Sequence, residues 1–259
     1  MNIRTVMDWK IFWILFMAAE ISMFASLPYA VSISGDAIYG MGTSLIGLLM
    51  VQFARGTGFL ILSIFTGIFL GKKVGLGTPL LESLLEGRGL PVDFGSSVKL
   101  IVFFGVFLAT SLFAIDKFIF SMYTDSFISF LTAPPFWERF MYSFYAGIVE
   151  EVILRFFMVT LLVWISWKIK KTSEDLPTNM GVWVSILVVS LLYGLVHISS
   201  LSESMGFVVP AYVGIMTLDI MSGSIMGWLY WKKGIEAAIL ANLVASLTLY
   251  MVIGSLIHL

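Results

Sequence analysis

Long apolar segments are the feature of this sequence that most constrains its fold. A helix needs about 20 mostly apolar residues to cross a hydrocarbon core of roughly 30 Å. The chain has seven such segments, at residues 10–33, 45–71, 98–122, 139–167, 181–200, 206–230 and 234–257. Because backbone groups inside lipid must be satisfied within a segment, each is predicted to be a helix. We therefore expect an all-α, polytopic transmembrane helix bundle with about seven to eight spans.

The composition agrees with a protein whose main partner is the lipid bilayer. Of the 259 residues, 59% are hydrophobic and only 12% are charged, whereas an average soluble domain is about 25% charged. No internal repeat or linker divides the chain. We expect one transmembrane domain over residues 1–259, with a motif-bearing core at about 139–257.

The placement of Lys and Arg predicts how the spans are oriented. These residues gather before the first span and after the second, fourth and sixth spans, and the other loops have almost none. The set is Arg4, Lys10, Lys72, Lys73, Arg88, Lys99, Lys168, Lys170, Lys171, Lys232 and Lys233, with Arg139 as an exception. We expect a multi-pass protein of the cell membrane with a cytoplasmic N-terminus. The amphipathic stretch PLLESLLEG (79–87) is predicted to form a short helix at the membrane interface.

Composition also excludes several functions. A net charge of −1 gives no electrostatic footprint for nucleic acid. The absence of cysteine excludes disulfides, thiolate metal sites and cysteine nucleophiles. The two histidines, His197 and His258, do not form the HExxH pattern of a zinc site. We expect neither a metal nor another cofactor.

Ionisable residues inside spans indicate functional sites, because their burial without a partner is costly. They are Glu20, Arg55, Glu150, Glu151, Arg155, His197, Asp219 and Glu236, to which the polar Asn242 is added. Structural roles are open for several of them. Glu20 and Arg55 could pair with each other, and Asp219 and Glu236 lie nearer helix ends, from which they could reach the interface.

The stretch GIVEEVILRFF (147–157) concentrates three of these charges. Glu151 and Arg155 are four residues apart, so they lie on one helix face in the order that favours an ion pair. Glu150 is rotated from Glu151 by about 100° and has no partner on its own helix. A poorly solvated carboxylate suits general-base work, so Glu150 is the candidate base and Glu151–Arg155 the supporting pair.

Two further pairs have the same spacing of four residues, Tyr193–His197 and Asn242–Ser246. His197 could share a water molecule with Glu150, and Asn242 and Ser246 could donate hydrogen bonds to a developing oxyanion. Together these groups favour hydrolysis of an acyl bond by an activated water. Each of them is also an ordinary packing or interhelical hydrogen-bonding residue when taken singly.

Several of these segments resemble one known family. EEVILR (150–155) resembles the EExxxR motif of the CPBP family, the CAAX proteases and bacteriocin-processing enzymes, which includes type II CAAX prenyl endopeptidases and bacterial Abi proteins. LLYGLVH (191–197) is similar to its second motif, an aromatic residue followed by His. GSIMGWLYWKKGIEAAILANLVASL (223–247) resembles the stretch leading into the third motif. The opening segment from Asp8 and the segment from Gly71 resemble archaeal and bacterial members.

The resemblance implies a metal-free intramembrane glutamic endopeptidase. It assigns water activation to Glu150, assistance to His197, and support to Glu151, Arg155 and the aromatic Tyr193. The family's third motif is commonly HxxxN and is thought to form the oxyanion hole. In this chain the corresponding positions are Asn242 and Ser246.

We therefore expect a peptidase that cleaves a peptide or protein substrate, membrane-associated or prenylated as in CAAX substrates. The altered third motif keeps open an alternative, a proteolytically inactive member acting as a scaffold or as a bacteriocin-immunity-type protein. A small transporter ranks last, because the chain shows no inverted repeat. Straight helices place Glu150, His197 and Asn242 at different depths, so a common site requires tilted or broken helices around a cavity.

Overall fold

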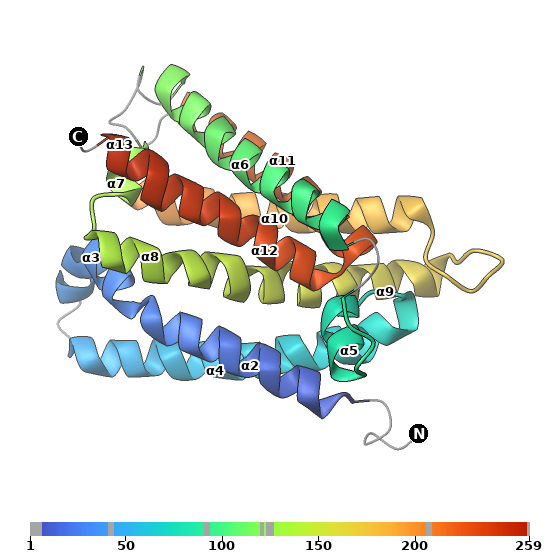
Figure 1. The fold of residues 1–259 in the computed structure, drawn as a ribbon. Helices are drawn as coiled ribbons and strands as arrows, with labels where there is room; N and C mark the ends of the chain where they lie inside the picture. Colours follow the sequence, from blue (N-terminus) through green and yellow to red (C-terminus); the bar gives the residue numbers. More distant parts are fainter. Residues whose placement is uncertain are drawn as a thin grey trace.

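Long helices lie side by side in the computed structural model, which describes residues 7–40, 44–90, 94–119, 122, 127–205 and 209–257 (Figure 1). The described residues form no β-strand, and a single isolated bridge joins Lys171 and Pro177. The helical elements are α2 (Trp9–Ala25), α3 (Leu27–Gly40), α4 (Leu45–Val74), α5 (Pro79–Leu85), α6 (Phe94–Phe118), α7 (Phe127–Leu131), α8 (Phe136–Phe144), η2 (Tyr145–Glu150), η3 (Val152–Val159), α9 (Thr160–Ile169), α10 (Asn179–Met205), α11 (Val209–Lys233), α12 (Ile235–Leu247), η4 (Thr248–Ile253) and α13 (Gly254–Ile257). The predicted all-α bundle is confirmed.

Six helices in the described part of the chain are long and apolar enough to cross a membrane. They run over Trp9–Ile33, Ile46–Val74, Gly95–Phe118, Asn179–Ser199, Tyr212–Lys233 and Ile235–Ile257, and they coincide with six of the seven predicted segments. The seventh predicted segment, 139–167, lies within α8, η2, η3 and α9, which follow one another without a break over residues 136–169. The chain is a multi-pass membrane protein.

Local sequence signals set several helix boundaries. Asp8 caps α2, because its side chain accepts hydrogen bonds from the backbone N–H groups of Lys10 and Ile11. α4 ends at Gly75, whose φ of 72° is in the left-handed region that glycine tolerates. Gly234, with φ of 93°, makes the tight turn between α11 and α12.

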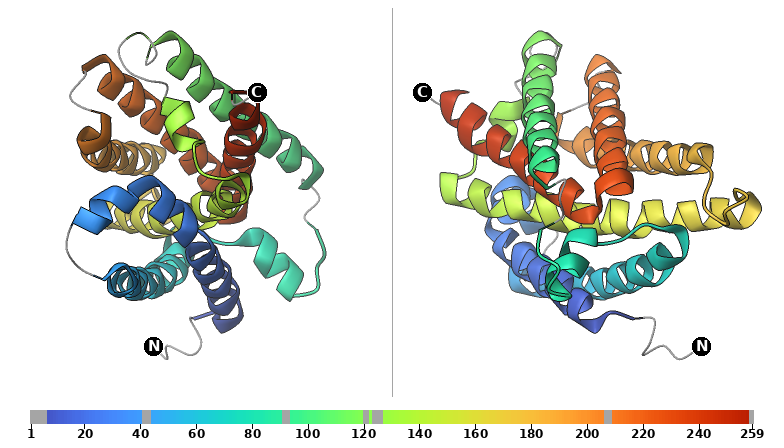
Figure 2. Two further views of the ribbon diagram at one scale, coloured as in Figure 1. Left: turned by 90° about the vertical axis from the view of Figure 1, so that its left-hand side faces the viewer. Right: turned by 45° about the vertical axis from the view of Figure 1, so that its right-hand side comes forward.

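The helix ends gather at two opposite ends of the bundle (Figures 1 and 2). At one of them, which we call the lysine-rich end, α4, α9 and α11 end and α5 lies across the turn before α12. There the N–H of Ile235 donates to the carbonyl oxygen of Gly77 at 3.1 Å. At the other, the α7 end, the Tyr29 hydroxyl donates to the carbonyl oxygen of Leu131 at 2.9 Å, and Ser32 Oγ donates to Glu138 Oε2 at 2.6 Å.

The predicted short helix over PLLESLLEG is present as α5. Glu236 Oε1 at the start of α12 accepts a hydrogen bond from the N–H of Leu81 at 2.8 Å. Glu236 is buried and does not reach the interface as the sequence allowed. Instead its carboxylate ties α5 to the bundle.

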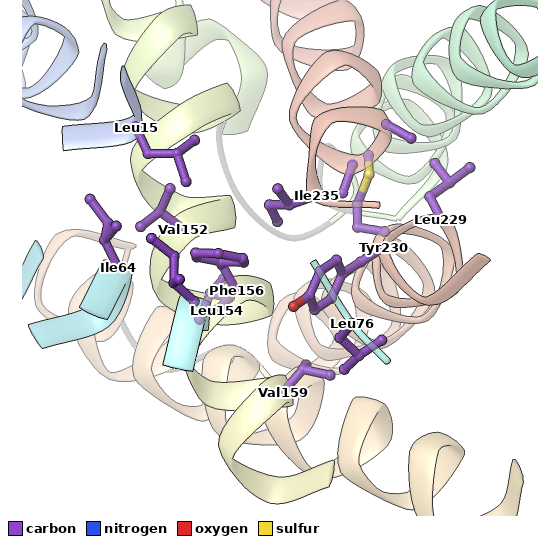
Figure 3. Close-up of a cluster of buried hydrophobic side chains, with 14 of the residues drawn as sticks. Leu15, Ile64, Leu76, Val152, Leu154, Phe156, Val159, Leu229, Tyr230 and Ile235 are labelled. Carbon is purple, nitrogen blue, oxygen red and sulfur yellow. The ribbon is translucent and has the colours of Figure 1, made fainter. Parts of the chain in front are cut away.

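A cluster of buried apolar side chains surrounds η3 (Figure 3). Val152 and Phe156 project from η3 toward Ile64 of α4 and Tyr230 of α11. The hydroxyl groups of Tyr230 and Thr160 are hydrogen-bonded at 2.6 Å, so the polar end of the buried tyrosine is satisfied. This core fixes the helix that carries Glu150, Glu151 and Arg155 between α4 and α11.

Two π-helical segments flank Glu151 on this helix, η2 before it and η3 after it. π-helical turns are rare and occur frequently at functional sites. They alter which side chains face a neighbouring helix, and no simple sequence period predicts them. Glu150, Glu151 and Arg155 therefore lie where this helix departs from α geometry.

Candidate active site

The predicted pair between Glu151 and Arg155 is present and buried. Arg155 Nη1 donates to Glu151 Oε1 at 2.9 Å, and the two side chains are 7% and 0% exposed. Burying both partners together avoids the large cost of one isolated charge. The opposite charges of Glu151 and Arg155 therefore neutralise each other within one helix.

Asn242 of α12 contacts the helix that carries Glu150 and Glu151. Its Nδ2 group donates to Glu151 Oε1 at 2.8 Å and to the carbonyl oxygen of Ala146 at 2.9 Å. Both partners are acceptors, so the two amide N–H groups are used here. This placement differs from the oxyanion-donor role expected for Asn242, because the amide is directed at the helix backbone and at Glu151.

A glycine allows this close contact. A Cβ atom added to Gly147 of η2 would lie 2.9 Å from Leu243 Cβ and 3.1 Å from Leu243 Cα of α12. A side chain at this position would therefore push the two helices apart. Gly147 explains how the amide of Asn242 reaches the carbonyl of Ala146 and the carboxylate of Glu151.

Glu150 faces the other way, toward α10. Tyr193 donates its hydroxyl hydrogen bond to Glu150 Oε2 at 3.2 Å. The rings of Tyr193 and His197 lie one helical turn apart, with their centroids separated by 4.9 Å. The direct partner of Glu150 is thus Tyr193, and His197 lies beside that tyrosine.

His197 is held by a residue that the sequence reasoning did not assign to the site. Its Nδ1 atom lies 3.3 Å and 3.2 Å from the two carboxylate oxygens of Asp219 on α11. The sequence allowed Asp219 to reach the interface, but its side chain is 9% exposed and faces His197. An ionisable residue in an apolar helix was the signal that could have identified it.

One cavity of about 260 Å³ brings these residues together. Its polar lining includes Glu150, Arg155, Tyr193, His197, Asp219, Ser222, Asn242 and Ser246. The remaining lining is mainly apolar, from Leu108, Ala109, Leu112, Phe127, Leu131, Tyr142, Ala146, Ile215, Leu218, Met226, Ala245, Leu249 and Tyr250. Straight helices would place Glu150, His197 and Asn242 at different depths. These residues can line one cavity because α12 crosses the Glu150 helix obliquely (Figure 1).

The other intramembrane charges lie outside this cavity. No ion pair joins Glu20 and Arg55 in the described part of the chain, and Glu20 Oε1 is buried there without a hydrogen-bond partner. Among the described residues, no group of three or more His, Asp or Glu side chains is placed to hold a metal ion. The cavity is the place where the described polar residues of several helices converge.

Most of the polar residues that meet in the cavity come from the three motif stretches, 150–155, 191–197 and 223–247. The match to a protein family falls in the same part of the chain. Residues 132–248 match the family model of type II CAAX prenyl endopeptidase Rce1-like proteins. The chain is Rce1-like over this segment. The Rce1-like segment contains all seven predicted site residues and Asp219, and it confirms the family that the motifs indicated.

The similarity to type II CAAX prenyl endopeptidases thus extends over residues 132–248, which is less than half of the chain. Comparison with curated proteins and with solved structures gives no match. The helices before residue 132 contribute Leu108, Ala109, Leu112, Phe127 and Leu131 to the cavity. The site is therefore built mainly, but not wholly, from the Rce1-like segment.

Proposed function

We propose that this protein is an intramembrane glutamate-dependent endopeptidase in which Glu150 activates a water molecule. The division of roles between the two adjacent glutamates carries the proposal. Glu151 is bound by Arg155 and Asn242, whereas Glu150 lines the cavity and is contacted by the hydroxyl of Tyr193. A carboxylate placed in a cavity of low polarity is suited to take a proton from water.

The proposed reaction begins when Glu150 removes a proton from a water molecule in the cavity. The water oxygen forms a bond to the carbonyl carbon of the scissile peptide, and the carbonyl electron pair moves to its oxygen. When the tetrahedral intermediate collapses, the C–N bond breaks, and protonated Glu150 delivers its proton to the leaving nitrogen. The products are one new carboxyl group and one new amine.

The neighbouring side chains serve this reaction in separate ways. Asp219 fixes the ring of His197, as a carboxylate on one imidazole nitrogen sets the tautomer and orientation of the ring, and His197 helps to hold the water beside Glu150. In this proposal Ser246 donates its hydroxyl hydrogen bond to the oxyanion. Asn242 acts indirectly, because it holds Glu151 and the backbone of η2 in place.

The apolar lining of the cavity favours a membrane-associated peptide as the substrate. The family's description points to prenylated, CAAX-type peptides as the first substrates to test. Peptides with the same sequence but without the lipid form the matched comparison, since they separate recognition of the lipid from recognition of the chain.

A cleavage assay with the purified protein in proteoliposomes tests this function. Wild type is compared with Glu150→Gln, His197→Ala and Ser246→Ala on a panel of membrane-anchored peptides, prenylated and unprenylated. Loss of the base should lower the rate by at least about 10²-fold. Glu86→Gln is the matched control, because the side chain of Glu86 is 61% exposed and lies outside the cavity.

Two results would contradict the proposal. The first is cleavage by Glu150→Gln at the wild-type rate. The second is cleavage only by a double variant that restores the usual third motif, Asn242→His with Ser246→Asn, which would make the native chain an inactive binding protein.

A second measurement separates the role of Asp219 from a purely structural one. Asp219→Asn keeps the size of the side chain but removes the charge beside His197, so we expect a lower kcat and a changed pH dependence of cleavage with KM little altered. A merely structural role would lower the unfolding temperature and leave the pH profile of the remaining activity unchanged.

A further inference from the structure

A second groove lies apart from the cavity that contains Glu150, among the ends of four helices at the α7 end of the bundle (Figure 1). It has a volume of about 410 Å³. The end of α2 and the starts of α3, α4 and α8 form its lining, which consists of Phe24, Leu27, Pro28, Val31, Ser32, Leu49 and Glu138. We call it the Glu138 groove. All of its lining residues except Ser32 and Glu138 are apolar.

Glu138 supplies the charge in this groove. It lies in the first turn of α8, and the residue is only 8% exposed. Ser32 Oγ donates to Glu138 Oε2 at 2.6 Å. An ionised carboxylate has about four acceptor positions on its two oxygens, so this one donor leaves most of its hydrogen-bonding capacity unused. The groove therefore combines apolar walls with one buried group that can accept further hydrogen bonds.

No cationic side chain of the described residues neutralises Glu138. None of their ion pairs includes it, and no Lys or Arg lines the groove. The neighbouring Arg139 faces elsewhere, because its guanidinium carbon lies 5.8 Å from the centre of the Phe136 ring and its Nη1 would be 2.7 Å from a Cβ added to Gly254 of α13. The helix dipole stabilises a carboxylate in the first turn, but by less than the cost of burying it unpaired. This imbalance favours a cation from outside the chain.

The surroundings of the groove indicate where that cation comes from. Phe24 in its lining is 66% exposed, and Ile46 and Met50, which flank Leu49 on α4, are exposed as well. Exposed apolar side chains on spanning helices face the acyl chains of the bilayer. Trp137, beside Glu138, is also exposed, and tryptophan at a helix end is typical of the depth of the lipid headgroups. The groove thus lies where acyl chains meet headgroups.

We propose that the Glu138 groove binds a phospholipid whose headgroup carries a primary ammonium, with the ammonium on the Glu138 carboxylate and an acyl chain along the apolar wall of α2 and α3. A primary ammonium brings a positive charge and three N–H donors, which match the free acceptor positions of Glu138. A quaternary ammonium has the charge but no N–H donor, and an anionic headgroup is repelled. The bound lipid joins the ends of α2 and α3 to α4 and α8, so it stabilises the bundle independently of any cleavage.

Lipid binding to the purified full-length protein tests this site. The protein is freed of lipid in detergent and titrated with phosphatidylethanolamine, phosphatidylcholine or phosphatidylglycerol of identical acyl chains, and native mass spectrometry gives the affinity for the first lipid bound. Glu138→Gln removes the charge but keeps the shape and an acceptor for Ser32. Val31→Phe narrows the groove and leaves the carboxylate in place. Glu86→Gln is the matched control, because Glu86 is exposed and lies outside the groove.

Wild type and Glu86→Gln should bind phosphatidylethanolamine at least about tenfold more tightly than phosphatidylcholine, as expected for hydrogen bonds to a charged group. Glu138→Gln should bring this ratio close to one, and Val31→Phe should weaken the binding of phosphatidylethanolamine. Phosphatidylethanolamine should also raise the unfolding temperature of wild type more than that of either groove variant.

Equal affinities of wild type for phosphatidylethanolamine and phosphatidylcholine would overturn the proposal, and would mean that a proton rather than a lipid neutralises Glu138. Tighter binding of phosphatidylglycerol, or an unchanged preference in Glu138→Gln, would also contradict it. Wild-type affinity in Val31→Phe would place the lipid outside the groove. If Glu138→Gln does not fold, the comparison of lipids on wild type and on Val31→Phe still decides.

Discussion

Asn242 holds the carboxylate of Glu151 across the interface between α12 and the Glu150 helix. Nδ2 of Asn242 and Nη1 of Arg155 both donate to the same oxygen, Glu151 Oε1, at 2.8 Å and 2.9 Å. In the described structure Glu151 Oε2 is buried without a hydrogen-bond partner. The motif thus contains one glutamate fixed by two neighbours and one, Glu150, that faces the cavity.

The first prediction follows from the two hydrogen bonds that Asn242 donates. Asn242→Leu keeps the approximate volume and leaves the Ala146 carbonyl and Glu151 Oε1 each without one donor. Leaving a buried polar group unsatisfied costs about 1–3 kcal/mol, so we expect a clearly lower unfolding temperature in detergent. Ser246→Ala is the control on the same helix and should change it little. Equal effects of the two substitutions would show that the Asn242 amide does not hold the interface.

The second prediction concerns the two adjacent glutamates. Glu151→Gln leaves the buried Arg155 without its counter-ion, and breaking a buried pair costs about 3–5 kcal/mol. Glu150→Gln removes a carboxylate that has no ion-pair partner among the described residues, so the fold should be retained while cleavage is lost. Thermal unfolding and the cleavage assay measure the two effects on the same preparations.

The double variant Glu151→Leu with Arg155→Leu extends this test. Replacing both partners of a buried pair by apolar residues is often neutral or stabilising, so the double variant should recover much of the stability lost in Glu151→Gln. A double variant as unstable as the sum of the two single leucine variants would mean that the pair is not coupled.

The third prediction uses two helical glycines that differ in their surroundings. A methyl group on Gly147 would meet Leu243, whereas one on Gly58 of α4 would meet no atom within 4 Å. Gly147→Ala should destabilise the protein, since overpacking costs about 1–3 kcal/mol. Gly58→Ala should stabilise it slightly, because Ala favours a helix over Gly by up to about 1 kcal/mol. The unfolding temperatures should shift in opposite directions, and equal shifts would contradict the close approach of η2 and α12.

Some of these features could be predicted from the sequence because they depend on local spacing. Apolar segments of span length identify the helices, and the distance of four residues between Glu151 and Arg155 is enough to predict their ion pair. The same logic separates Glu150 from Glu151, since adjacent residues on a helix point in different directions. Polar residues inside apolar spans also identified His197 and Asn242 as candidates, and the family motifs include the same positions.

The contacts between helices could not be predicted in this way. Tyr193 reaches Glu150, Asp219 reaches His197 and Asn242 reaches Glu151 only because of helix tilt, rotation and close approach at Gly147. Two π-helical segments, η2 and η3, further shift the faces that these side chains present. The hydrophobic periodicity of a sequence does not reveal such changes of helix face. For this reason we expected Asn242 to donate to an oxyanion and did not predict its hydrogen bond to Glu151.

The fourth prediction concerns Glu236 and the short helix α5. Glu236 Oε1 accepts from the N–H of Leu81 at 2.8 Å, in the first turn of α5, where a carboxylate also interacts favourably with the helix dipole. Glu236→Ala should release α5 and expose the connection between α4 and α6 to a protease of broad specificity. Glu86→Ala is the matched control in that connection, because it removes only an exposed ion pair with Arg88, and such pairs contribute little. Faster cleavage of the connection in Glu236→Ala alone is expected, and equal cleavage rates in both variants would mean that α5 is held by its apolar contacts instead.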